Sequence, residues 1–184
     1  MLLTIPYQLL EPQNIQLENF HADYKQRIIA PLLYKAVAVQ FNDVPILTPI
    51  LTVSEYNSVT NRIRFDIKDS PAFAAKIQLF QDTIMQKFYQ KRFDIFKLDV
   101  TMEEIKSTFQ LLYHGTMLTL FIFPTSQVKM ADGSAKIVGQ LKANDKIRCV
   151  IRIHGVSMLP VRVTDFFPRF RIQHSVPMVY GITA

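Results

Sequence analysis

The stretch Lys146–Gly155, KIRCVIRIHG, decides the fold of this chain. Successive side chains of a β-strand point to opposite faces of the sheet. Read as a strand, this stretch has one apolar face, made by Ile147, Cys149, Ile151 and Ile153. Its other face carries Arg148, Val150, Arg152 and His154. The alternation predicts a strand with a buried face and a basic face.

A second stretch, Phe167–Gln173 (FPRFRIQ), has the same pattern. Arg169 and Arg171 fall on one face, and Phe170 falls on the other. If the two stretches are neighbouring strands, four arginines converge on one side of the sheet. Such a surface is typical of polyanion binding, and a single nucleic-acid strand is the first candidate. A solvated sheet face is the alternative interpretation.

Composition sets limits on the class of protein. The chain has 184 residues, enough for one domain with a real core, and a net charge of +6 from 21 basic and 15 acidic residues. This charge favours an anionic partner. The single cysteine, Cys149, has no partner for an intramolecular disulfide, which favours a reducing compartment such as the host nucleus or cytoplasm. No apolar run is long enough to span a bilayer, so no membrane partner is expected.

Two helices are predicted in the middle of the chain. Ser70-Pro71 is a typical helix start, and apolar residues recur at helical spacing after it, so we expect a helix over about 71–92. Thr101 and Glu104 match a capping box, which predicts a second helix over about 102–114. Short alternating stretches elsewhere, such as Arg62–Ile67, are typical of strands.

This order of elements predicts a mainly β protein with inserted helices. We expect a five-stranded oligonucleotide-binding (OB) fold barrel, partly open, over residues 31–184. Residues 1–30 are expected to form an N-terminal arm or edge segment. A jelly roll is the second candidate, although it needs more strands of even spacing.

The sequence contains no recognisable catalytic centre. It has no nucleophile motif, and its four histidines lack metal-ligand spacing. The aspartates form no cluster for two-metal chemistry, and five glycines make no phosphate-binding loop. We therefore expect a protein that is not an enzyme and that uses no cofactor and no metal.

The second half of the chain contains a capped helix (TMEEIKSTF), an apolar strand, the strand IRIHGV and, after a gap, RFRIQHS. This order resembles the single-stranded DNA-binding proteins of large eukaryotic DNA viruses, which are similar to those of short-tailed bacteriophages. The resemblance covers residues 36–175. It implies an OB barrel, no catalytic residues, and a role in DNA replication and recombination. Two departures are the absence of a tryptophan near Val156 and an end, YGITA, without the acidic tail of the phage proteins.

The sequence thus predicts a protein that binds single-stranded DNA with little sequence preference; RNA is the second candidate ligand. The residues expected to hold phosphates are Arg148, Arg152, Arg169 and Arg171, extended by Lys142, Lys146, Arg62 and Arg64. The aromatic residues expected to stack on bases are Phe167 and Tyr180.

Further expected partners are a second copy of the chain and replication proteins. The alternative is a structural or interaction protein, such as a virion or assembly component, that uses the basic face as a subunit interface. An enzyme acting on nucleic acid is a third candidate, and it would need acidic side chains beside the basic face.

Overall fold

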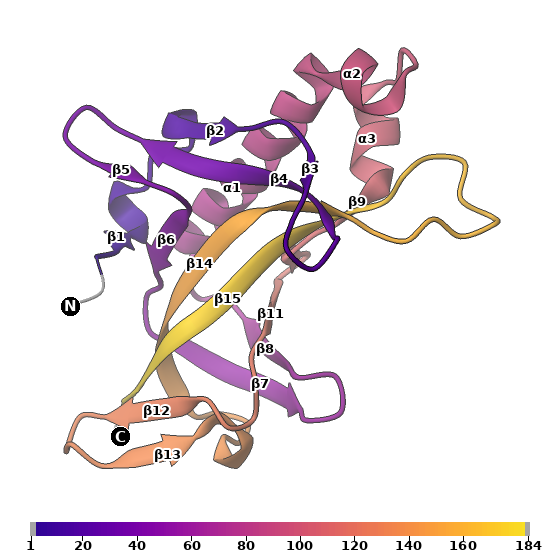
Figure 1. Ribbon diagram of the computed structural model, residues 1–184. Coiled ribbons are helices and arrows are strands. Elements are labelled where there is room, and N and C mark those ends of the chain that lie inside the picture. Colours follow the sequence, from indigo (N-terminus) through magenta and orange to yellow (C-terminus); the bar gives the residue numbers. More distant parts are fainter. Residues whose placement is uncertain (1–2, 183–184) are drawn as a thin grey trace.

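The computed structural model describes residues 3–182 and has a mainly β architecture with inserted helices (Figure 1). Within these residues fifteen strands join one mixed sheet. The helices are α1 (Pro71–Gln90), α2 (Arg92–Phe96) and α3 (Met102–Thr108). The strands before the helices are β1 (Ile5–Pro6), β2 (Ile15–Leu17), β3 (His21–Ala22), β4 (Ile28–Lys35), β5 (Gln40–Phe41), β6 (Val44–Leu47), β7 (Leu51–Asn57) and β8 (Arg62–Asp66). Those after are β9 (Phe109–Gln110), β10 (Tyr113–His114), β11 (Met117–Phe121), β12 (Gln127–Met130), β13 (Ala135–Ile137), β14 (Lys146–Met158) and β15 (Phe170–Gly181).

Strand β14 is the centre of the sheet. It pairs with β15 along most of its length, in antiparallel orientation, so the two basic stretches of the sequence are neighbouring strands. Its other edge pairs in turn with β7, β6 and β4. In Figure 1, β14 and β15 form a long curved ribbon that runs from the helices to the β12–β13 hairpin.

The predicted apolar face of β14 is confirmed. Each of its four side chains is at most 1% exposed: Ile147, Cys149, Ile151 and Ile153. Burial raises the pKa of the Cys149 thiol to about 12, so this group stays protonated at neutral pH. Cys149 is therefore a packing residue rather than a reactive thiol.

Helix α1 covers the sheet with a row of phenylalanines. Phe73, Phe80 and Phe88 are fully buried, which confirms the helical spacing read from the sequence. The Phe88 ring lies 5.0 Å from that of Phe170 at the start of β15, in an edge-to-face arrangement. Aromatic pairs of this geometry add to the free energy of area burial, so they hold the helix on the sheet.

The second predicted helix is shorter than expected. The capping box is confirmed, because the Glu104 N–H donates to Thr101 Oγ1 at 3.2 Å and the Thr101 N–H donates to Glu104 Oε2 at 2.7 Å. However, α3 ends at Thr108 instead of residue 114. The chain then becomes extended, because Phe109 and Gln110 pair with the start of β15. The first predicted helix ends at Gln90, and α2 follows as a separate turn.

The sheet lacks the backbone hydrogen bonds between β11 and β15 that would close it into a barrel. Hydrogen-bonded neighbours follow the order β11-β8-β7-β14-β15. Strands β11 and β15 lie side by side, joined by a hydrogen bond from the Phe121 N–H to His174 Nε2 at 2.8 Å. Strands β9 and β12 pair with the two ends of β15. Within residues 3–182 the sheet is not closed into a barrel, and the expected OB fold is not confirmed.

The N-terminal segment belongs to the same core. Leu10 and Ile15 are fully buried. The expected boundary between residues 30 and 31 falls inside β4, which pairs with β14. Residues 1 and 2 of the expected arm lie outside the described part of the chain. None of the helices described in residues 3–182 has the length and hydropathy of a membrane-spanning segment.

Gly155 tests the role of β14. A Cβ at this position would lie 2.4 Å from the Ala30 carbonyl oxygen of β4, so Gly155→Ala forces the two backbones apart. We expect a loss of about 1–3 kcal/mol of unfolding free energy or more, measured by urea denaturation. Gly139→Ala is the control. Its Cβ would lie 3.3 Å from the Pro124 carbonyl oxygen, a contact that a shift of a few tenths of an ångström relieves. Equal midpoints for the two variants would contradict the packing described.

Candidate nucleic-acid interface

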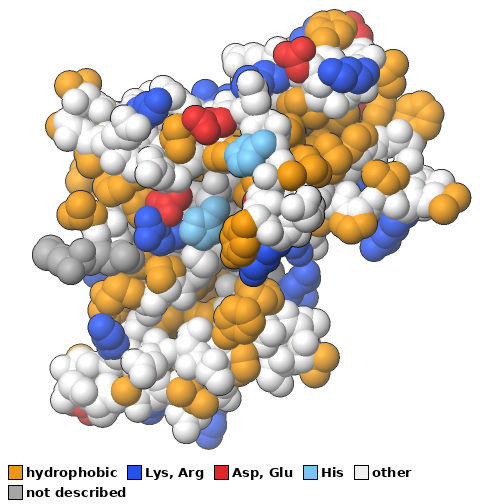
Figure 2. Space-filling view, viewed as in Figure 1, with side chains coloured by type: hydrophobic (Ala, Val, Ile, Leu, Met, Phe, Trp, Pro, Cys, Tyr) orange, Lys and Arg blue, Asp and Glu red, His pale blue; other side chains and the backbone are white. Residues whose placement is uncertain are grey.

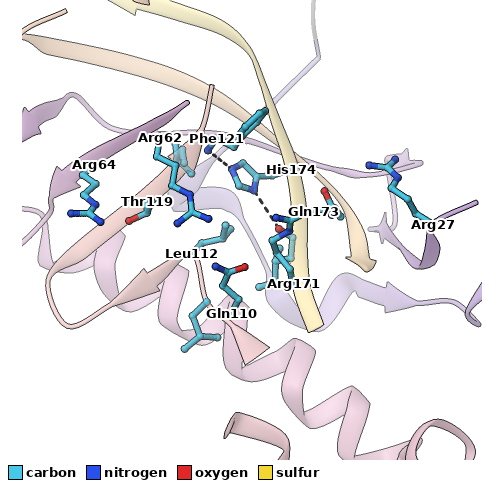
Figure 3. Close-up of a pocket in the computed structure, with 13 residues that line it drawn as sticks. Arg27, Arg62, Arg64, Gln110, Leu112, Thr119, Phe121, Arg171, Gln173 and His174 are labelled. Atoms are coloured by element: carbon cyan, nitrogen blue, oxygen red, sulfur yellow. Dashed lines mark hydrogen bonds between the residues drawn. The ribbon is translucent and has the colours of Figure 1, made fainter. Parts of the chain in front are cut away.

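A groove of about 350 Å³ opens at the gap between β11 and β15 (Figure 3). Strands β8 and β11 line one side, and residues 171–174 of β15 line the other. Residues 110–112, which follow α3, and Arg27, just before β4, complete the lining. The groove therefore exists because the ladder is missing between two strands that are otherwise close together.

Four arginines line this groove: Arg27, Arg62, Arg64 and Arg171. Arg62 and Arg64 are two positions apart on β8, so they share a face of the sheet, as the sequence predicts. Among residues 3–182 no carboxylate lines the groove. The described part of the groove is thus strongly basic.

Two of these arginines have carboxylate partners nearby. Arg27 Nη2 is 2.6 Å from Asp23 Oδ2, and Arg64 Nη1 is 3.2 Å from Glu55 Oε2. Arg62 and Arg171 form no ion pair with any residue from 3 to 182. Burial lowers the pKa of Arg171, and repulsion from Arg62 and Arg27 lowers it further. An anion between these groups would relieve that repulsion.

His174 is a neutral member of the groove. Its Nε2 accepts the hydrogen bond from the Phe121 N–H, so this nitrogen carries no proton. The proton of the neutral ring is then on Nδ1, which lies 3.3 Å from the Ile172 carbonyl oxygen. Burial lowers the pKa of His174 to about 4. The ring therefore joins β15 to β11 at neutral pH and adds no charge.

Two aromatic side chains stand at the rim. Phe121, the last residue of β11, is 40% exposed, and Phe123, just after the strand, is 58% exposed. Their rings are 5.1 Å apart and edge-to-face, at 79°. Phe121 also lines the groove itself. Exposed rings beside a basic groove are the parts from which single-strand binding sites are built.

The four arginines of the sequence prediction do not converge, which is a correction. Arg148 pairs across the ribbon with Tyr180, whereas Arg171 pairs with Ser157. Positions 148 and 157 of β14 are separated by roughly 30 Å at ~3.3 Å per residue. Two register shifts lie between them, and each changes which residues of the two strands face the same way. Of the four, Arg171 alone lines the groove.

Arg152 has a structural partner instead. Its Nε lies 2.7 Å from Oδ2 of Asp43, a buried carboxylate just before β6. The Nε–H does not point along this line, so the contact is an ion pair rather than an aligned hydrogen bond. His154 Nδ1 is 3.6 Å from the same oxygen. Removing Arg152 would leave a buried charge uncompensated, so this side chain holds the β14–β6 junction.

The other predicted cations also lie outside the groove. Arg169 is half-buried just before β15, and its carbonyl oxygen accepts the Leu159 N–H at 2.8 Å. Lys146 lines a separate cavity that includes Asp66 and Lys68. Lys142 is exposed in the turn before β14. These residues do not extend the track expected from the sequence.

The predicted stacking residues are placed differently as well. Phe167 is half-buried, and its ring packs edge-to-face on Phe96 at 6.0 Å. Its neighbour Phe166 is the exposed ring of that loop, at 84%. Tyr180 faces Arg148 across the ribbon, and its hydroxyl is 3.5 Å from Met178 Sδ. Neither predicted residue lines the groove.

Among the residues of the groove and its rim that were not predicted from the sequence are Arg27, Gln110, Thr119, Phe121, Phe123 and His174. Arg27 falls in residues 1–30, which the sequence predicts only as an N-terminal arm or edge segment. The run TMLTLFIF suggests burial on both faces, but Phe121 and Phe123 come at its end, next to Pro124. Their position at the end of the run, beside Pro124, is the only feature of the sequence that sets them apart.

The face of the molecule shown in Figure 2 has no continuous row of cations among the described residues. On the face shown in Figure 2, lysines and arginines lie in separate places, and hydrophobic side chains gather toward the helices. Within residues 3–182 no group of histidine, cysteine or acidic side chains could hold a metal ion.

His174 predicts a pH dependence of stability. Its pKa is about 4 in the folded protein and ~6.5 in an unfolded chain, so the unfolded state binds more protons between these values. Stability should therefore fall as pH drops from ~6.5 to ~4, by up to about 3 kcal/mol from this group. Over the same pH range, the denaturant midpoint of His174→Gln should fall less than that of the unmodified protein. His114→Gln, an exposed histidine outside the groove, is the control; a His174→Gln profile identical to that of the unmodified protein would contradict the assignment.

Comparison of the chain with models of known protein families finds no match, and comparison with curated protein sequences finds none either.

Proposed function

We propose that this protein binds a single strand of nucleic acid, DNA in the first instance, in the groove between β11 and β15. Binding is non-catalytic and has little sequence preference. The observation that supports this proposal is the presence of two arginines without described carboxylate partners, Arg62 and Arg171, in one groove with the exposed ring of Phe121. A role in DNA replication and recombination follows from the resemblance to viral single-stranded DNA-binding proteins.

The charges suit phosphate. Arginine presents a planar fork of N–H donors that matches phosphate oxygens. Arg62 of β8 and Arg171 of β15 lie on opposite sides of the groove (Figure 3). One phosphate between them can therefore contact both guanidinium groups. Such contacts carry no sequence information, which accounts for binding without sequence preference.

The aromatic rim suits a single strand rather than a duplex. A base can stack on Phe121 or Phe123 only if its face is free, and paired bases have no free face. Stacking of this kind accepts every base and contributes about 1–3 kcal/mol per base. The combination of free guanidinium groups and exposed rings therefore favours an unpaired strand.

We further propose that β7, β8, β11, β14 and β15 form an open version of the OB fold. These five strands follow one another in the sheet and return, at β15, to the side of β11. A closed barrel of five strands would also have backbone hydrogen bonds between β11 and β15. In this arrangement the ligand lies between those two strands, where these hydrogen bonds are missing.

Salt dependence tests the proposal. The double variant Arg62→Ala/Arg171→Ala should bind a single-stranded oligonucleotide about tenfold or more weakly. The slope of log K against log salt should become shallower by about 0.7, because the phosphate held between the two arginines is no longer neutralised. The measurement is fluorescence anisotropy at several salt concentrations, with Lys136→Ala/Lys142→Ala as the control of equal charge.

The melting midpoint separates a binding role from a structural one. Arg62 and Arg171 repel each other and have no described ion-pair partner, so their removal should leave the midpoint unchanged or slightly raised. Wild-type affinity and slope in the double variant would refute the proposed site. Loss of an oligomeric state in the double variant would favour the alternative, an interaction protein that uses this basic groove as a subunit interface.

A further inference from the structure

The basic groove is compact. Its volume of about 350 Å³ is near the lower end of the ~300–1,000 Å³ range of small-molecule sites. Arg62 and Arg171 lie near its middle and repel each other, while Arg64 and Arg27 lie toward opposite ends (Figure 3). Arg148, Lys142 and Lys146 lie outside the groove. An internal phosphodiester carries one charge and needs one cation, whereas the middle of the groove holds two cations close together.

The unpaired charges in the groove number two. Arg27 and Arg64 have Asp23 and Glu55 as partners, which leaves Arg62 and Arg171 without a partner among residues 3–182. A ligand group with two negative charges would therefore neutralise the charges of Arg62 and Arg171. A terminal phosphate monoester carries about −1.5 to −2 near pH 7 and presents three strong acceptor oxygens, whereas an internal phosphate carries −1.

Polar donors complete the same space. The side chains of Gln110 and Thr119 line the groove together with Arg62 and Arg171, and Figure 3 shows the Gln110 carboxamide between Leu112 and Arg171. An amide and a hydroxyl are donors for the additional oxygen of a monoester. Phe121, on the same wall as Thr119, is placed to stack on the base attached to that phosphate.

We infer that the groove binds the phosphorylated end of a nucleic-acid strand, with the terminal phosphate between Arg62 and Arg171 and the terminal base on Phe121. This inference rests on the proposed function and goes beyond it, since a protein can bind a strand without recognising the end of that strand. The chemistry is shared by a 5′-phosphate and a 3′-phosphate, and the experiment distinguishes the two.

The test compares three oligonucleotides of one sequence: one with a 5′-phosphate, one with a 3′-phosphate and one with hydroxyl groups at both ends. Affinities are measured by fluorescence anisotropy at pH 7.5 and constant salt, with the dye at an internal position. One phosphorylated end should bind about fivefold more tightly, the effect of one added charge ~4 Å from a guanidinium at the dielectric of water. The preference should shrink at pH 5.5, because the second pKa of the monoester is about 6.

Variants locate the preference. Arg62→Ala/Arg171→Ala should abolish it, and Lys136→Ala/Lys142→Ala should keep it. Arg171→Lys retains the charge but not the fork, so it should weaken binding of the phosphorylated strand more than binding of the hydroxyl-ended strand.

Three outcomes would overturn the inference. Equal affinity for the three oligonucleotides would refute end recognition, and strand binding would stand if the salt slope still depended on Arg62 and Arg171. A preference that survives in Arg62→Ala/Arg171→Ala would place the phosphate elsewhere. Failure of all three oligonucleotides to bind would overturn the proposed function and this inference with it.

Discussion

The structure depends on the pairing of β14 with strands on both of its edges. Its apolar face is buried in the core, and its backbone pairs with β15 on one side and with β7, β6 and β4 in succession on the other. This crowding leaves no room for a side chain at Gly155, where Ala30 of β4 approaches. It also bends the ribbon, because two register shifts occur within the β14–β15 pair. The position of every other strand follows from this ribbon.

The groove is a consequence of that bend. Strand β15 is held at its ends by β9 and β12, and its middle faces β11 across the gap. A neutral His174 bridges the gap through one hydrogen bond, so the two walls stay close without a ladder. Cations from β8 and β15 then meet in a space where they repel each other. The folded protein tolerates this repulsion between arginines. Unfavourable arrangements of charge are common at binding sites and uncommon where charge serves only solubility.

Much of the fold was predictable, because it depends on local patterns. The apolar alternation of Ile147–Ile153, the phenylalanine spacing of α1 and the Thr101–Glu104 capping box each depend on residues close in sequence, and each is confirmed. The site was predicted only in part. Arg62, Arg64 and Arg171 were named, but the register shifts that separate Arg171 from the arginines of β14 leave no pattern in the sequence. The early end of the helix predicted over 102–114 likewise depends on distant pairing, because residues 109 and 110 join β15 as β9.

The central claim is that a nucleic-acid strand lies in the gap between β11 and β15, with a base on the rim. Photocrosslinking tests it most directly: an oligonucleotide containing 5-iodouracil is bound and irradiated, and the crosslinked peptides are mapped by mass spectrometry. The account predicts crosslinks at Phe121 or Phe123. Crosslinks confined to Phe166, Phe167 or Tyr180, with none in residues 117–123, would contradict it.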